Sequence, residues 1–105
     1  MSTIAQRVAA GVAFLDAGGN PDWWRADIDL GVLDLADCGR CIFGQLYGHY
    51  WKGIELHELT DGATVALGFT VTGDEPGQEA DESEYAPLTA EWKRVIAGRR
   101  AAVYA

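Results

Sequence analysis

The sequence has few basic residues. It contains eight Lys and Arg against sixteen Asp and Glu, which gives a net charge of -8. A surface that follows a nucleic-acid backbone needs clustered Lys and Arg, so this balance argues against direct nucleic-acid binding. Half of the basic residues lie near the C-terminus, where they can complement the dipole of a helix: Lys93, Arg94, Arg99 and Arg100. We therefore expect an acidic surface and no nucleic-acid partner.

Long apolar runs are also missing. A membrane span needs about eighteen or more apolar residues in succession, and no stretch of the chain approaches that length. The apolar N-terminal segment is interrupted by Gln6, Arg7 and Asp16 and has no basic lead. We therefore expect neither a membrane span nor a signal peptide, and a location in the cytoplasm, where a cysteine pair is usually reduced, metal-bound or catalytic.

Motifs for nucleotide binding and catalysis are absent from the sequence. It has no P-loop, no G-x-G-x-x-G, no histidine near a serine in a nucleophile motif, and no EF-hand spacing of acids. Its 105 residues, 49% of them apolar, suit one domain with one modest core. We expect a single domain over residues 1–105 that is not an enzyme and carries no cofactor.

Apolar periodicity predicts helices at both ends of the chain. A helix from Thr3 to Asp16, capped by Ser2 or Thr3 and ended by Gly18 or Gly19, would place four apolar side chains on one face: Ile4, Val8, Val12 and Leu15. A helix from Pro87 to Gly98 would do the same with Leu88, Trp92, Val95 and Ile96.

The middle of the chain is less regular. Pro21 can open a short helical turn to about Ala26, and on a helix the adjacent Trp23 and Trp24 cannot both face one core equally. Turns rich in Asp follow. Asp37 then predicts the cap of a helix that Gly48 closes after Tyr47, placed centrally with the last helix packed across it. Within that helix, the polar Gln45 is expected to anchor buried hydrogen bonds.

Residues 54–72 support two interpretations. Alternation of apolar residues around Asp61-Gly62 favours a β-hairpin, while Thr60 or Asp61 could instead cap a short helix ended by Gly68. The segment that follows, residues 73–84, contains six acids and no base, and we expect it to be a mobile, solvated loop.

The two cysteines, Cys38 and Cys41, are spaced as C-x-x-C. On a helix begun by Asp37 they would share a face, and this spacing is also found in redox-active pairs. With His49 and His57 they could instead supply a zinc site, although C-x2-C-x7-H-x7-H is not the spacing of a zinc finger. A third interpretation is that both thiols pack as small apolar groups in the core. The first segments lack the strands that a thioredoxin-like fold requires, which favours core packing.

Five segments follow one another across residues 7–96: RVAAGVAFLD, WW, IDLGVLDLADCGRCIFGQLYGHY, LGF and YAPLTAEWKRVI. In this order they resemble a family of small proteins from actinobacteria and their bacteriophages. The resemblance implies a phage or prophage accessory protein in a bacterial host cell and no particular mechanism. It also implies that LGF ends a short helix, with Gly68 as the residue after it.

The sequence therefore predicts a mainly α fold, a bundle of four or five helices, with the hairpin at 54–72 as the alternative. We expect a non-enzymatic module that binds a host or phage protein through exposed aromatic residues, for which Trp24, Tyr50 and Trp51 are the candidates. The alternatives are a thiol redox or zinc protein that uses Cys38 and Cys41, and an acidic mimic of nucleic acid.

Overall fold

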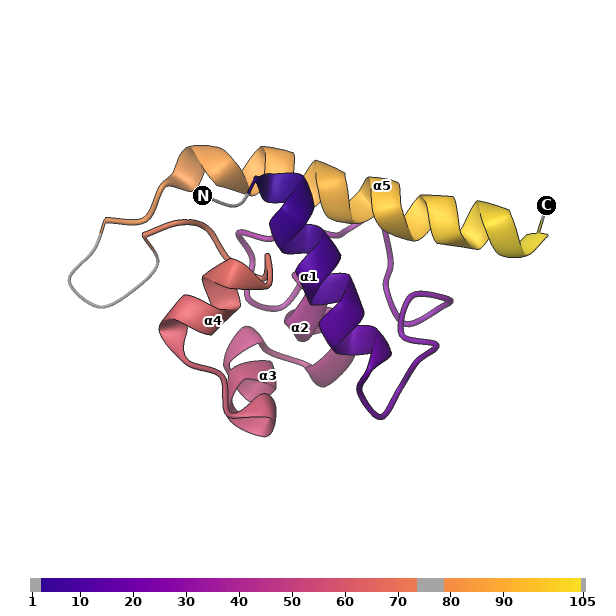
Figure 1. Cartoon of the computed structure of the whole chain (residues 1–105), viewed down its shortest axis with the longest axis horizontal. Helices are drawn as coiled ribbons and strands as arrows, with labels where there is room; N and C mark the ends of the chain where they lie inside the picture. Colours follow the sequence, from indigo (N-terminus) through magenta and orange to yellow (C-terminus); the bar gives the residue numbers. More distant parts are fainter. Residues whose placement is uncertain (1–2, 74–78, 105) are drawn as a thin grey trace.

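All regular secondary structure is helical in the part of the chain that the computed structural model describes, residues 3–73 and 79–104. Over these residues the fold has five α-helices and one short 3-10 helix and no β-strand (Figure 1). The elements are α1 (Ile4–Asp16), α2 (Ile42–Tyr47), α3 (Tyr50–His57), α4 (Asp61–Ala66), η1 (Glu82–Glu84) and α5 (Tyr85–Tyr104). The predicted mainly α fold is confirmed.

Helix α1 begins as the sequence predicts. The Thr3 hydroxyl accepts from the Gln6 amide, and the Gln6 side chain accepts from the Thr3 amide, so two N–H groups that the helix leaves unpaired are satisfied. Its end differs from the prediction, because Ala17 is the C-cap and keeps right-handed helical angles. Gly18 and Gly19 do not take the left-handed conformation.

Helix α2 is shorter than predicted. Asp37 starts a single turn, in which its carbonyl accepts from the amides of Arg40 and Cys41, and the helix proper starts only at Ile42. Its N-cap is Cys41, and Gly48 ends it with φ +94 as expected. After one further residue α3 begins, and these two helices pack against each other.

The β-hairpin alternative for residues 54–72 is wrong, because α3 and α4 occupy this stretch. The Thr60 hydroxyl caps α4 by accepting from the Ala63 amide. Gly68, with φ +72, follows the helix in the left-handed region that favours glycine. The capping residues therefore indicated the secondary structure of this segment correctly, whereas the alternation of apolar residues favoured strands.

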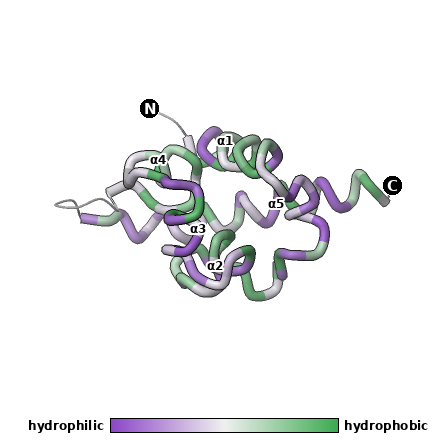
Figure 2. The backbone as a smooth tube through the Cα atoms, turned by 90° about the horizontal axis from the view of Figure 1, so that it is seen from below, coloured by the Kyte–Doolittle hydropathy of each residue, from purple (hydrophilic) through white to green (hydrophobic). Residues whose placement is uncertain are grey.

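Helix α5 is longer than predicted at both ends, and it lies along the long axis of the molecule with its C-terminal end projecting beyond the other elements (Figure 1). Its main helical partner is α1, and not α2 as expected from the sequence. In Figure 2 apolar and polar residues alternate along the C-terminal half of α5. Over the whole helix, the buried side chains are Leu88, Trp92 and Ile96.

A column of aromatic rings forms the centre of the core. Phe43 from α2 stacks on Phe69 with ring centroids 4.1 Å apart, and Phe69 stacks on Trp92 from α5 at 5.5 Å. Trp23 meets the edge of Trp92 at 6.0 Å. The indole N–H of Trp92 donates to the Gly68 carbonyl at 2.7 Å, so this buried polar group has its partner. The column connects α2 with α5 through a residue that follows α4.

Residues 17–41 form a long irregular segment that distant side chains hold in place. The Gln45 amide donates to the carbonyls of Asp29 and Arg40, both at 3.1 Å, and accepts from the Asp29 amide. The Arg100 guanidinium donates to the carbonyls of Trp24 and Ile28. The predicted role of Gln45 as a hydrogen-bonding anchor is confirmed, although the side chain is only half-buried.

The acidic segment is only partly covered by the structure. Residues 74–78, within the expected mobile loop, lie outside the described residues, whereas residues 79–84 include η1. The buried Arg7 donates to the Thr72 hydroxyl and to the Glu84 carboxylate, on either side of the segment. None of the helices over the described residues has the length and apolar character of a membrane span.

Candidate functional site

The three aromatic residues expected at an interface differ in exposure. Trp24 and Tyr50 are buried, with 8% and 9% of their surface exposed, whereas Trp51 is 60% exposed. Trp24 and its neighbour Trp23 are both buried because they lie in turns and not on one helical face, which corrects the expectation that only one would be. Of the three candidates, only Trp51 presents its ring to solvent.

The burial of Trp24 has a clear structural role. Two guanidinium groups lie over its ring, that of Arg25 at 4.7 Å and that of Arg99 at 5.8 Å from the centroid. Arg99 also forms a double hydrogen bond with Asp16 at the end of α1. Trp24 therefore helps to fasten the end of α5 to the body of the molecule.

Trp51 shares the exposed side of α3 with a second large apolar residue, Leu56, which is 58% exposed. At about 100° per residue, the order around the helix is Trp51, Glu55, Lys52 and Leu56, over an arc of about 140°. We call these four residues the α3 face. Its two apolar side chains flank two charged ones, and Glu58 lies exposed just beyond the helix.

Sequence reasoning missed Leu56, and helical periodicity gives no signal for its exposure. On a helix Leu56 lies only about 60° from Gly53, three residues earlier, which is buried. Its exposure follows from how α3 packs and not from the pattern of WKGIELHEL.

Cys38 and Cys41 lie in the single turn before α2 and not on a face of that helix itself. Cys38 is exposed, whereas Cys41 is 2% exposed and its sulfur accepts from the Gly44 amide at 3.3 Å, as N-cap of α2. Burial raises the pKa of the Cys41 thiol to about 11, with smaller opposing effects from backbone hydrogen bonds. The expectation of core packing therefore holds for Cys41 and is wrong for Cys38.

The two histidines have structural roles of their own. His49 caps α3, its Nδ1 accepting from the Trp51 amide at 3.2 Å. His57 is half-buried, and its ring packs against those of Phe14 and Phe43. Over residues 3–73 and 79–104, no three His, Cys, Asp or Glu side chains form a group that could hold a metal ion. The predicted zinc alternative therefore lacks its ligand set.

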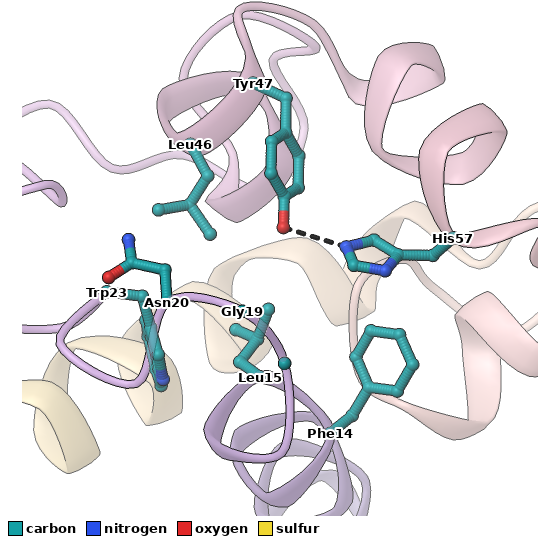
Figure 3. A pocket seen from close by; sticks show the side chains of 9 residues that line it. Phe14, Leu15, Gly19, Asn20, Trp23, Leu46, Tyr47 and His57 are labelled. Carbon is teal, nitrogen blue, oxygen red and sulfur yellow. Dashed lines mark hydrogen bonds between the residues drawn. The ribbon is translucent and has the colours of Figure 1, made fainter.

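A small pocket beside His57 was not anticipated. Its volume is about 60 Å³, and Figure 3 shows Leu46 and Tyr47 on one side and Phe14 and Leu15 on the other. The Tyr47 hydroxyl is hydrogen-bonded to His57 Nε2 at 2.8 Å, and burial raises the pKa of this tyrosine. Tyr47 and His57 are ten positions apart in the sequence, and no sequence pattern pointed to the pair.

The chemistry available in this pocket is limited. Its nine lining residues include neither a carboxylate nor a thiol nor a lysine. Tyr47 and His57 are already paired with each other, and the remaining lining is mainly apolar. For any chemistry the pocket therefore offers one phenol and one imidazole, which are already hydrogen-bonded to each other.

No protein-family model, curated protein or solved structure matches this chain. Functional inference for this chain must start from its own side chains. Over the described residues, Trp51 and Leu56 of the α3 face are the two most exposed of the large apolar side chains.

Proposed function

We propose that this protein is a non-enzymatic module that binds another protein through the α3 face. In keeping with the sequence resemblance, the proposed partner is a host or phage protein in the cytoplasm of an actinobacterium. The observation that carries the proposal is the exposure of Trp51 together with Leu56 on one side of α3. Tryptophan is the residue most enriched among side chains that dominate binding energy at interfaces.

The charge of the chain defines the partner's expected chemistry. The net charge is -8; Glu55 and Lys52 lie between the apolar side chains of the α3 face, and Glu58 is exposed just beyond the helix. A partner that fits would offer an apolar cavity for the indole, bordered by Lys or Arg. Opposite charges around such a cavity would speed association and favour this partner over acidic competitors.

The position of Trp51 makes it suitable for a clean test. It contacts the neighbouring Tyr50 ring at 5.4 Å between centroids but is not part of the aromatic column of the core. Replacing Trp51 therefore removes an exposed ring at little expected cost to the fold. Val32, which is also exposed but lies in the irregular segment 17–41, supplies a matched control for loss of an exposed apolar side chain.

The experiment compares wild type, Trp51→Ala and Val32→Ala in capture from actinobacterial lysate, followed by calorimetry with each purified captured protein. We expect a partner retained by wild type and Val32→Ala whose affinity falls at least tenfold for Trp51→Ala, since hot-spot losses reach about 2 kcal/mol or more. Partners that bind all three proteins equally would contradict the proposal. Circular dichroism establishes that the variants are folded.

A further inference from the structure

The turn that carries the two cysteines brings them close enough to be joined. The Asp37 carbonyl accepts from the amides of Arg40 at 3.1 Å and Cys41 at 2.9 Å, so residues 37–41 form one helical turn. By helix geometry, Cα atoms three residues apart in such a turn lie about 5 Å apart, within the roughly 4.4–6.8 Å that a disulfide spans. A shift of the turn must bring the two Cβ atoms from about 5–6 Å to the roughly 3.5–4.5 Å of a closed bond. The Cys41 sulfur already lies 3.8 Å from the Cys38 carbonyl oxygen.

The two thiols also open onto one cavity, though to different degrees. Both line a cavity of about 40 Å³ whose other walls include Tyr50, Thr70 and Tyr85. That volume exceeds the roughly 10–15 Å³ that a single water requires, so a molecule as small as hydrogen peroxide can enter. Cys38 is exposed and Cys41 is buried behind it. An oxidant arriving from solvent meets Cys38 first.

The same turn supports two helices. The Cys41 sulfur caps α2, and the Cys38 carbonyl accepts from the Tyr50 amide in the first turn of α3 at 2.9 Å. Gly44 lets the turn lie directly on α2, since a Cβ there would overlap the Cys38 carbonyl and Gly39. Any change in the covalent state of the cysteines therefore acts on the start of both helices.

We propose that Cys38 and Cys41 are a peroxide-sensitive dithiol that closes reversibly to an intramolecular disulfide. In the first step the Cys38 thiolate attacks peroxide: a S–O bond forms, the O–O bond breaks, and hydroxide leaves and is protonated to water. In the second, Cys41 loses its proton and attacks the Cys38 sulfur, so that the S–S bond forms and the oxygen leaves as a second water. Two thiols are oxidised and one peroxide is reduced.

Exposure sets the order of these steps. Cys38 is the thiol that solvent reaches, whereas burial keeps Cys41 protonated at neutral pH. A sulfenic acid on Cys38 has Cys41 as its neighbour in the same turn, which makes it the resolving thiol. A cellular dithiol would reverse the reaction by exchange, which suits a reducing compartment.

The test treats reduced, full-length protein with a small excess of hydrogen peroxide in the presence of a chelator. We expect the wild type to lose the mass of two hydrogen atoms and both titratable thiols, with full recovery by dithiothreitol. Peptide mapping is expected to locate the disulfide between Cys38 and Cys41. It also distinguishes this disulfide from oxidation of Met1, which adds the mass of an oxygen atom. Products that carry only added oxygen, or only disulfide-linked dimers, would overturn the proposal.

Two single variants assign the roles. Cys41→Ser is expected to stop at a Cys38 sulfenic acid that a 1,3-dione reagent traps. Cys38→Ser keeps the capping thiol and is expected to leave Cys41 unmodified over the time in which the wild type is fully oxidised. Equal reactivity of Cys41 in this variant would exclude Cys38 as the first site of attack. Because the wild type carries the main readout, the result does not depend on how the variants fold.

Discussion

At residue 53 the side chain is a single hydrogen atom, and the ring of Phe43 fills the space beside it. A Cβ at this position would overlap Cγ and Cδ2 of that ring. Phe43 cannot swing aside cheaply, because it is fully buried and stacked on Phe69. The close packing of α3 on α2 therefore depends on glycine at this position.

Replacing Gly53 with Ala is expected to destabilise the protein by about 1–3 kcal/mol, the usual cost of forcing extra volume into a packed core. Gly98 in α5 is the matched control, since a Cβ there meets no atom within 4 Å. Gly98→Ala should stabilise by about 0.5–1 kcal/mol, because alanine loses less backbone entropy in a helix. Urea unfolding followed by tryptophan fluorescence measures both, and shifts of equal sign would contradict the packing argument.

Single residues differed in how well the sequence predicted them. Gln45 was predicted as an anchor because a polar residue in an apolar helix needs partners. Cys38 and Trp24 were placed wrongly because their exposure depends on a turn and on guanidinium groups from far along the chain. Neither the composition of the chain nor the spacing of its residues predicts contacts with residues so far away in the sequence. The α3 face was half predicted, through Trp51.

At the scale of elements, local capping was the best guide. As expected, α1 and α4 begin after the capping residues Thr3 and Thr60, and α2 and α4 are followed by the left-handed glycines Gly48 and Gly68. These features could be predicted because their hydrogen bonds and dihedral angles involve residues close in sequence. The start of α2 was misplaced because Asp37 and Cys41 can both cap, and tertiary packing selects Cys41. The Asp-rich turns within residues 17–41 were predicted and are present. The distant partners of this segment, Gln45, Thr89 and Arg100, could not be predicted from its own sequence.

The end of α5 offers a test of this long-range support. Arg100 donates to two carbonyls of the irregular segment, and Arg99 pairs with Asp16. A chain ended after Arg100 keeps both groups and should stay within about 0.5 kcal/mol of the full chain. A chain ended after Gly98 loses both and should be less stable by about 2 kcal/mol or more, since hydrogen bonds from charged groups contribute about 1.5–3 kcal/mol each.

Chemical unfolding of the two shortened chains distinguishes these outcomes. Amide hydrogen exchange of residues 20–30 should also accelerate only in the shorter chain, because the carbonyls that Arg100 holds lie there. Identical midpoints and exchange rates would show that α5 does not fasten this segment.

For the whole molecule, two ion pairs link α1 to the C-terminal half. Hydrogen bonds from Arg99 lower the pKa of Asp16, with a smaller opposing effect of burial. Burial raises the pKa of Glu84, but hydrogen bonds from Thr72 and Arg7 outweigh it, so the net shift is downward. Both carboxylates therefore bind protons less readily in the folded chain than in the unfolded one.

The stability from these pairs is present above the pKa of the unfolded carboxyls, about 4, and is lost as pH falls through the lower folded values. We expect an Asp16→Asn, Glu84→Gln variant to be less stable than wild type at pH 7, with a difference that shrinks below about pH 4. Urea midpoints between pH 7 and 3 measure it. If the difference in stability between wild type and variant does not change with pH, the variant loses stability through packing and not through the two ion pairs.

Arg7 has one more consequence, for how this chain tolerates change in length. It joins Thr72 to Glu84, and the Asp81 amide donates to the Thr72 carbonyl at 2.8 Å, so the two ends of the acidic segment meet at a fixed base. By loop-closure entropy, tripling the number of residues between two fixed points costs only about 1 kcal/mol. The segment is thus a place where evolution or an engineer can add sequence while the helices keep their positions.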